Sequence, residues 1–75
     1  MDKHVEAIIS KINAKLNKAT TSKEPKFYLV FEITKDEFPI IQQHFQQSNF
    51  NFFLSKNKNN KKYNHLCQVN YTRKG

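Results

Sequence analysis

The chain has 75 residues, enough for one small domain, and carries a net charge of +7 with one Cys, one Gly and two Pro. A domain of this length buries only about 60% of its unfolded surface, so its seven Phe and three Tyr are expected to supply much of the core. The composition excludes an intramolecular disulfide and any apolar run long enough to span a membrane.

The first predicted element is an amphipathic helix. Apolar residues recur from Val5 to Leu16 with the i, i+3, i+4, i+7 spacing of one helical face, while Lys and Glu occupy the other face. Asp2 is expected to cap this helix at its N-terminus. The helix is expected to end between Asn17 and Ala19, because the segment TTSKEP that follows resists helix continuation.

Residues 27–33, FYLVFEI, predict a strand, because they are β-branched or aromatic almost throughout and contain no breaker. The odd positions, from Phe27 to Ile33, form a strongly apolar face. Tyr28 and Val30 make the other face partly apolar, and Glu32 on that face is expected to point toward water.

A second helix is predicted next, and two start points are open. Thr34 and Glu37 have the spacing of a capping box, but that start places Pro39 at the fifth helical position, where a backbone hydrogen bond is lost. Capping by Asp36 places the proline in the first turn and is slightly favoured. The helix is expected to run to about Gln47.

The remaining chain predicts a β-hairpin. It follows Asn49, which is expected to end the second helix in a left-handed conformation. Residues 50–55 and 63–71 alternate between two faces, and Phe50, Phe52, Val69 and Tyr71 are expected to close the core. The connecting segment KNKNNKK predicts a turn, because its Asn residues tolerate positive φ.

The order helix, strand, helix, strand, strand predicts an α/β (α+β) fold. We expect a two-layer sandwich in which both helices cover one face of a three-stranded mixed sheet. A right-handed crossover makes the first two strands parallel. The third strand is then expected to run antiparallel to them, and it can lie between them. In the alternative, the first helix packs on the opposite face and the domain has three layers.

The charge is unevenly distributed along the chain. Residues 1–37 hold seven Lys and six acids, for a net charge of +1, whereas residues 38–75 hold five Lys, one Arg and no acid, for +6. Such basic clusters bind the phosphates of nucleic acid, although a solvated turn is the simpler interpretation. The expected nucleic-acid-binding residues lie in and beyond the hairpin: Lys56, Lys58, Lys61, Lys62, Arg73 and Lys74.

A second candidate surface is the sheet face that points away from the helices. Four large apolar side chains are expected there: Tyr28, Val30, Phe53 and Leu66. This is more than scattered exposure and predicts a contact surface. Aromatic residues on such a face stack unpaired bases, as in RNA-binding sheets, or contact a second copy of the chain or a host protein.

The third candidate is a reactive or metal-binding pair. His65 and Cys67 lie two apart in a strand and therefore share a face, but no third or fourth ligand has a recognisable spacing. Their face is the one assigned to the core, where a free Cys behaves as a small hydrophobe. We expect no metal, no cofactor and no enzyme activity; a ribonuclease with His44 or His65 as general base is the remaining catalytic alternative.

The runs FYLVFEITKDEFPIIQQHF, SNFNFF and CQVNY, with the helix before them, resemble the short accessory proteins of phages and mobile elements. This resemblance implies a non-enzymatic protein that binds DNA or RNA, or an inhibitor that binds a host protein. Because the chain is basic, such an inhibitor is expected to bind an acidic surface of the host protein. It also implies a location in the host cytoplasm. A cytoplasmic location fits the single Cys and the charged start, which lacks an apolar secretory core.

Overall fold

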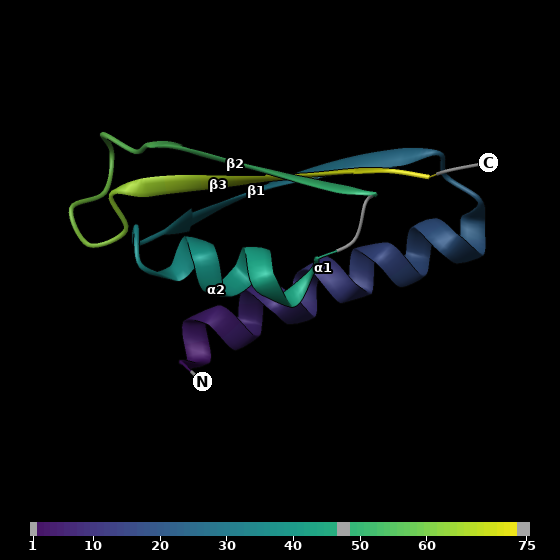
Figure 1. The fold of residues 1–75 in the computed structure, drawn as a ribbon, viewed down its shortest axis with the longest axis horizontal. Helices are drawn as coiled ribbons and strands as arrows, with labels where there is room; N and C mark the ends of the chain where they lie inside the picture. Colours follow the sequence, from purple (N-terminus) through teal and green to yellow (C-terminus); the bar gives the residue numbers. More distant parts are fainter. Residues whose placement is uncertain (1, 47–48, 74–75) are drawn as a thin grey trace.

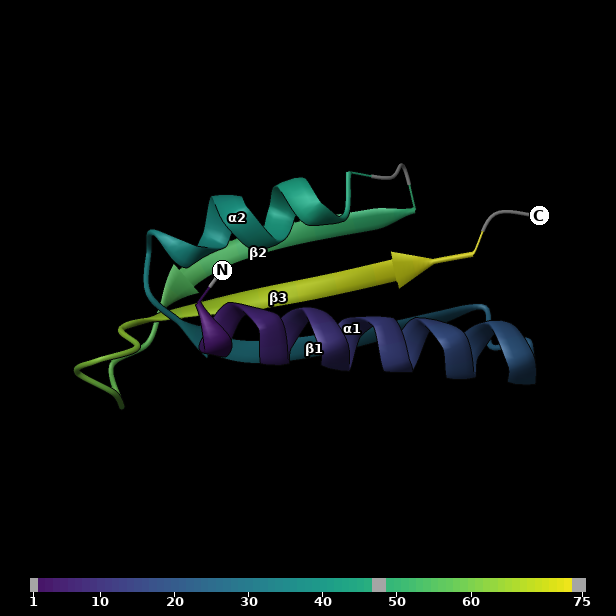
Figure 2. The same cartoon turned by 90° about the horizontal axis from the view of Figure 1, so that it is seen from below.

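The structure is a computed structural model that describes residues 2–46 and 49–73. Its elements are α1 (Lys3–Ser22), β1 (Lys26–Ile33), α2 (Glu37–His44), β2 (Phe50–Lys56) and β3 (His65–Thr72). The predicted element order and two-layer architecture are confirmed, because both helices lie on the same face of a three-stranded sheet (Figure 1). Seen from the helix side, α1 lies along β1 and α2 lies along β2 (Figure 2). No helix of the described residues covers the opposite face of the sheet (Figure 1).

The strand order is β1-β3-β2, so the last strand of the chain lies in the centre. Both ladders are antiparallel, and β1 and β2 therefore run in the same direction without pairing. The prediction of a mixed sheet is therefore wrong, because both strand pairs are antiparallel. The reason is that β3 occupies the place between the two parallel strands that the crossover leaves.

The first helix is longer than predicted. It begins as expected, with the Asp2 carboxylate accepting from the His4 N–H at 3.2 Å, but it continues to Ser22. The hydroxyl groups of three consecutive residues, Thr20, Thr21 and Ser22, donate to carbonyls four positions back at 2.7–2.9 Å. These hydroxyl groups thus bond back to helical carbonyls, which is the geometry that Ser and Thr adopt when they lie inside a helix. Lys23 then ends it in the left-handed conformation, with φ 60°.

The second helix begins at Glu37 with Asp36 at the N-cap position, as the slightly favoured start predicts, and the capping-box hydrogen bonds of the alternative form as well. The Thr34 N–H donates to Glu37 Oε1 at 2.8 Å, and the Glu37 N–H lies 3.3 Å from Thr34 Oγ1. Asp36 flanks the helix without a side-chain cap. The box spans a turn that precedes the helix, so Pro39 still falls in the first α-helical turn and costs no hydrogen bond. The helix ends earlier than expected, at His44.

The core lies between the helices and the inner face of the sheet. It consists of aliphatic residues from α1 and α2, and of a row of aromatic rings across the three strands. Phe27 and Phe50 both lie opposite Tyr71 in the register, and its ring is 4.9 and 5.1 Å from theirs. Rings at these distances contribute about 0.5–1.5 kcal/mol per pair beyond their buried area. The predicted inner face of the hairpin is therefore confirmed.

None of the helices in the described ranges is long and apolar enough to cross a membrane.

Candidate functional site

The side of the sheet that no described helix covers presents side chains from all three strands. We call it the outer face, and the antiparallel register aligns its residues in rows because directly opposed residues share a face. One row contains Tyr28, Asn70 and Asn51, and the next contains Val30, Gln68 and Phe53. The ends of the face are formed by these residues: Lys26, Thr72, Glu32, Leu66 and Ser55.

The predicted apolar residues all occupy this face. Tyr28 is 68% exposed, Phe53 54% and Val30 48%, while Leu66 is half-buried. Tyr28 and Phe53 come from the two edge strands, one row apart, and so flank the central strand from opposite sides. A single sheet layer leaves these rings with no covering element among residues 2–46 and 49–73.

Amide side chains fill the space between the two rings. Gln68 and Asn70 project from the central strand, and the Gln68 Nε2 donates to Asn70 Oδ1 at 3.0 Å. Asn51, on β2, lies directly opposite Asn70 and is exposed. We call Asn51, Gln68 and Asn70 the amide column. One mutual hydrogen bond leaves these three amides with several donors and acceptors for a ligand.

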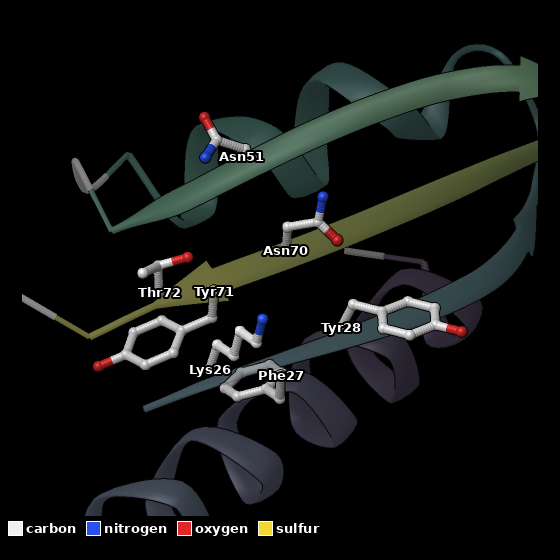
Figure 3. A pocket seen from close by; sticks show the side chains of 7 residues that line it. All are labelled: Lys26, Phe27, Tyr28, Asn51, Asn70, Tyr71 and Thr72. Atoms are coloured by element: carbon white, nitrogen blue, oxygen red, sulfur yellow. The ribbon is translucent and has the colours of Figure 1, made fainter. Parts of the chain in front are cut away.

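A shallow hollow of about 440 Å³ lies at the end of the outer face where β1 begins and β3 ends (Figure 3). Asn51 and Asn70 border it from the two neighbouring strands, and Tyr28 and Lys26 border it from β1. An aromatic ring, two amides and an ammonium group therefore surround one concave surface. Its residues are Lys26, Phe27, Tyr28, Asn51, Asn70, Tyr71 and Thr72.

The basic residues predicted to form one site are divided between two ends of the sheet. Lys58, Lys61 and Lys62, called here the tip lysines, lie in the hairpin loop, residues 57–64, before β3 begins. Arg73 follows the last residue of β3. Eight strand residues separate the two ends by about 25 Å. Lys56 is exposed but has the register of the helix-covered face, and Lys74 lies outside the described residues.

The hairpin loop is held by Asn57 and not by positive φ angles. Lys23 is the one non-glycine residue with positive φ in the described ranges, so the predicted Asn conformations are wrong for this loop and for Asn49. The buried Asn57 side chain donates to Glu32 Oε2 at 2.7 Å and to the Tyr63 carbonyl at 2.9 Å, and accepts from a neighbouring backbone N–H. Asn60 similarly accepts from two backbone N–H groups. Side-chain hydrogen bonds of this kind form Asx-turns.

Most residues of the outer face are uncharged or positively charged. Glu32 is the one acid among the outer-face positions of the three described strands, and its carboxylate accepts the Asn57 hydrogen bond. It lies at the loop end of the sheet, away from the hollow beside Lys26. The rest of the face is therefore free of the like charge that repels phosphate.

The thiol of Cys67 lies in the core, as the assignment of its strand face predicts. Cys67 is fully buried, and burial raises the pKa of its thiol to about 11, which keeps it protonated. His65 Nδ1 lies 2.9 Å from the side-chain oxygen of Asn64. Within residues 2–46 and 49–73, no three His, Cys, Asp or Glu side chains are grouped to hold a metal ion.

Sequence reasoning missed two groups of residues. The first is the amide column, whose Asn and Gln residues alternate visibly along each strand but come together only through the register. The second is a cluster that fixes the loop. His4 Nδ1 lies 2.8 Å from Glu37 Oε2, and the His4 ring stacks on Tyr63 with centroids 4.1 Å apart. No sequence spacing signals contacts among three separate segments.

No protein-family model, curated protein or solved structure matches this chain.

Proposed function

We propose that this protein is a non-enzymatic module that binds single-stranded nucleic acid on the outer face of its sheet. The observation that carries this proposal is the arrangement of exposed Tyr28 and Phe53 around the amide column on an uncovered sheet. Basic residues at both ends of the same surface support it.

The two rings supply stacking. Each is more than half exposed, so a planar base gains contact without displacing a protein side chain. Stacking of one base on an aromatic side chain contributes about 1–3 kcal/mol, and it accepts any base because every base has a π face. Tyr28 and Phe53 are therefore assigned two bases, one on each side of β3.

The amide column supplies hydrogen bonds to base edges. Single-stranded RNA is recognised through the Watson–Crick and Hoogsteen edges of splayed bases, which present adjacent donors and acceptors. Asn and Gln carry the same pair of groups in one side chain. Asn51 and Asn70 line the same hollow as Tyr28, so a base held in that hollow would meet amides from two strands.

The two basic ends supply phosphate contacts. The tip lysines lie at one end of β3, and Lys26 and Arg73 lie at the other. The separation of about 25 Å is the length of a short extended oligonucleotide lying along the sheet. A duplex fits less well, because its paired bases cannot stack on side chains. Single strands are therefore the favoured ligand.

The test is fluorescence anisotropy with labelled oligouridylate, oligothymidylate and a duplex of equal length. We expect the single strands to bind more tightly than the duplex, with a log–log salt slope near −3 for about four phosphates. Replacing both Tyr28 and Phe53 with Ala is expected to weaken single-strand binding at least about tenfold.

The matched control replaces Ile40 and Leu54, which are exposed apolar residues outside the outer face, with Ala. This variant should bind like the unaltered protein. Equal losses in both double variants, or salt-independent binding, would refute the proposal.

Protein interaction through the same face is the second candidate function, supported by Val30 and the half-buried Leu66, which add apolar area beside the rings. A second copy of the chain or an acidic host protein would then cover the face. Sedimentation tests the first of these. A monomer at high concentration, together with oligonucleotide binding, favours the nucleic-acid function.

A further inference from the structure

We infer that the free edge of β1 receives an extended acidic and apolar segment of a partner protein, which adds to the sheet as a fourth strand. This site lies beside the outer face and does not depend on the nucleic-acid proposal. Three features of the structure carry it: outward backbone groups on β1, an apolar groove beneath them, and lysines along the rim of that groove.

The backbone of β1 has one unpaired side. β1 pairs with β3 alone in the described residues. The Arg73 N–H donates to the Pro25 carbonyl at 2.6 Å, which fixes the alternation of hydrogen bonds along this ladder. In an antiparallel ladder every second residue directs both backbone groups to its partner, and those between direct them away. Tyr28 and Val30 are therefore residues whose N–H and C=O groups face outward.

The middle of this edge lacks the usual protection against pairing. Exposed edge strands are commonly blocked by charged residues, by proline or by a bulge. β1 carries charge only at Lys26 and Glu32, near its ends, and residues 27–31 between them are uncharged. Pro25 precedes the strand. A partner strand thus meets five consecutive residues without a charge or a proline.

A groove runs along the helix side of the same edge. Two hollows of about 390 and 430 Å³ lie between α1 and β1, and they adjoin because both are bordered by Lys11 and Phe31. The half-buried side chains of Leu29 and Phe31 form the floor next to β1. A strand added to β1 would direct alternate side chains into this groove, so apolar residues are expected at those positions.

The rim of the groove determines the charge of the partner. Lys11, Lys15 and Lys18 line the hollow beside Leu29, whereas Glu32 borders the second hollow near the loop end of the sheet, so the acidic residues of a partner are expected at the first hollow. Within the described residues only Lys15 has a carboxylate in ion-pair range, Glu24 at 3.8 Å. Acidic residues on the added strand would pair with these lysines. A second copy of this chain is disfavoured, because it would bring two such basic rims together.

The other sheet edge does not offer the same site. The groove beside β2 is lined by Gln42, Gln43 and Gln46 from the segment containing α2, together with Phe50 and Phe52. This groove presents amide side chains, whereas the groove beside β1 presents Ala14, Leu29 and the methylene groups of lysine side chains. An apolar and acidic strand therefore fits β1, and β2 provides an internal control.

The experiment uses a labelled synthetic peptide of about nine residues in which Thr alternates with Glu and Leu, so that Glu and Leu enter the groove. Val30→Pro removes an outward N–H without breaking the β3 ladder, and is expected to weaken peptide binding at least about tenfold. Reversing Lys11, Lys15 and Lys18 to Glu should weaken it by about the same factor.

Two controls isolate strand addition. Leu54→Pro makes the same change on the β2 edge, where the backbone also faces outward, and should leave binding unchanged. A peptide N-methylated at the amides facing β1 should not bind, which tests the inference even if a proline variant fails to fold. Absence of peptide binding, binding insensitive to N-methylation, or self-association through β1 in place of peptide binding would each overturn the inference.

Discussion

His4 and Glu37 lie 33 positions apart in the sequence, yet the His4 Nδ1 is 2.8 Å from Glu37 Oε2. The other carboxylate oxygen of Glu37 accepts the Thr34 N–H, and the His4 ring stacks on Tyr63. One buried carboxylate and one ring therefore join the start of α1, the start of α2 and the hairpin loop. This cluster fixes the loop, and hence the tip lysines, relative to the sheet.

Replacing Glu37 with Ala is expected to lower the free energy of unfolding by about 2–3 kcal/mol, because it removes the capping box and the partner of His4 together. Glu37→Gln keeps an acceptor for the Thr34 N–H and should cost less. Urea denaturation gives both values. The control is Glu6→Ala, an exposed acid in the first turn of α1, which should change stability by less than about 0.5 kcal/mol. A Glu37→Ala protein as stable as this control would contradict the assigned role.

Asn57→Ala is expected to destabilise the protein by about 1–3 kcal/mol, since the buried side chain bonds Glu32, the Tyr63 carbonyl and a backbone N–H. Hydrogen exchange should accelerate at residues 57–64 more than in the strands. Asn59→Ala is the matched control, because Asn59 contributes its backbone N–H to this network and its side chain is exposed. Equal exchange in the two variants would show that Asn57 does not hold the loop.

The protein is expected to lose stability at high pH, because the thiol of Cys67 is buried. Its thiol has an ordinary pKa of 9.0, and burial raises this to about 11 in the folded protein. Because the thiol ionises at a lower pH in the unfolded chain than in the folded protein, its burial contributes about 2–3 kcal/mol of pH-dependent stability. This contribution is fully present below pH 9 and is lost as the pH rises through 11. Stability measured from pH 8 to 11 should therefore fall more steeply for the unaltered protein than for Cys67→Ala. Parallel curves would contradict the burial of this thiol.

Reversing the tip lysines Lys58, Lys61 and Lys62 to Glu is expected to weaken single-strand binding and to reduce the salt slope by about 2, since each lost phosphate contact removes about 0.7. The matched control reverses three α1 lysines on the helix side, Lys3, Lys11 and Lys18, for the same change in net charge. If both triple variants lose binding equally, net charge and not position determines affinity, and the loop has no specific role.

The sequence was sufficient for the element order, the two layers and the apolar residues of the outer face, because each follows from periodicity within one segment. It was insufficient where segments meet. The first helix continues through Thr20, Thr21 and Ser22, which local propensity disfavours, and the loop depended on Asn57 reaching Glu32 across 25 positions. The amide column likewise required the register of three strands, which no single segment contains.

The most direct test of the central claim follows the side-chain amide signals of Asn and Gln in nitrogen-15 NMR spectra while an oligouridylate is added. The binding site proposed here predicts large shifts for Asn51, Gln68 and Asn70, which lie on the outer face, and none for Gln42 and Gln43 on α2. Shifts confined to the tip of the hairpin, or to the helix side, would show that the outer face is not where nucleic acid binds.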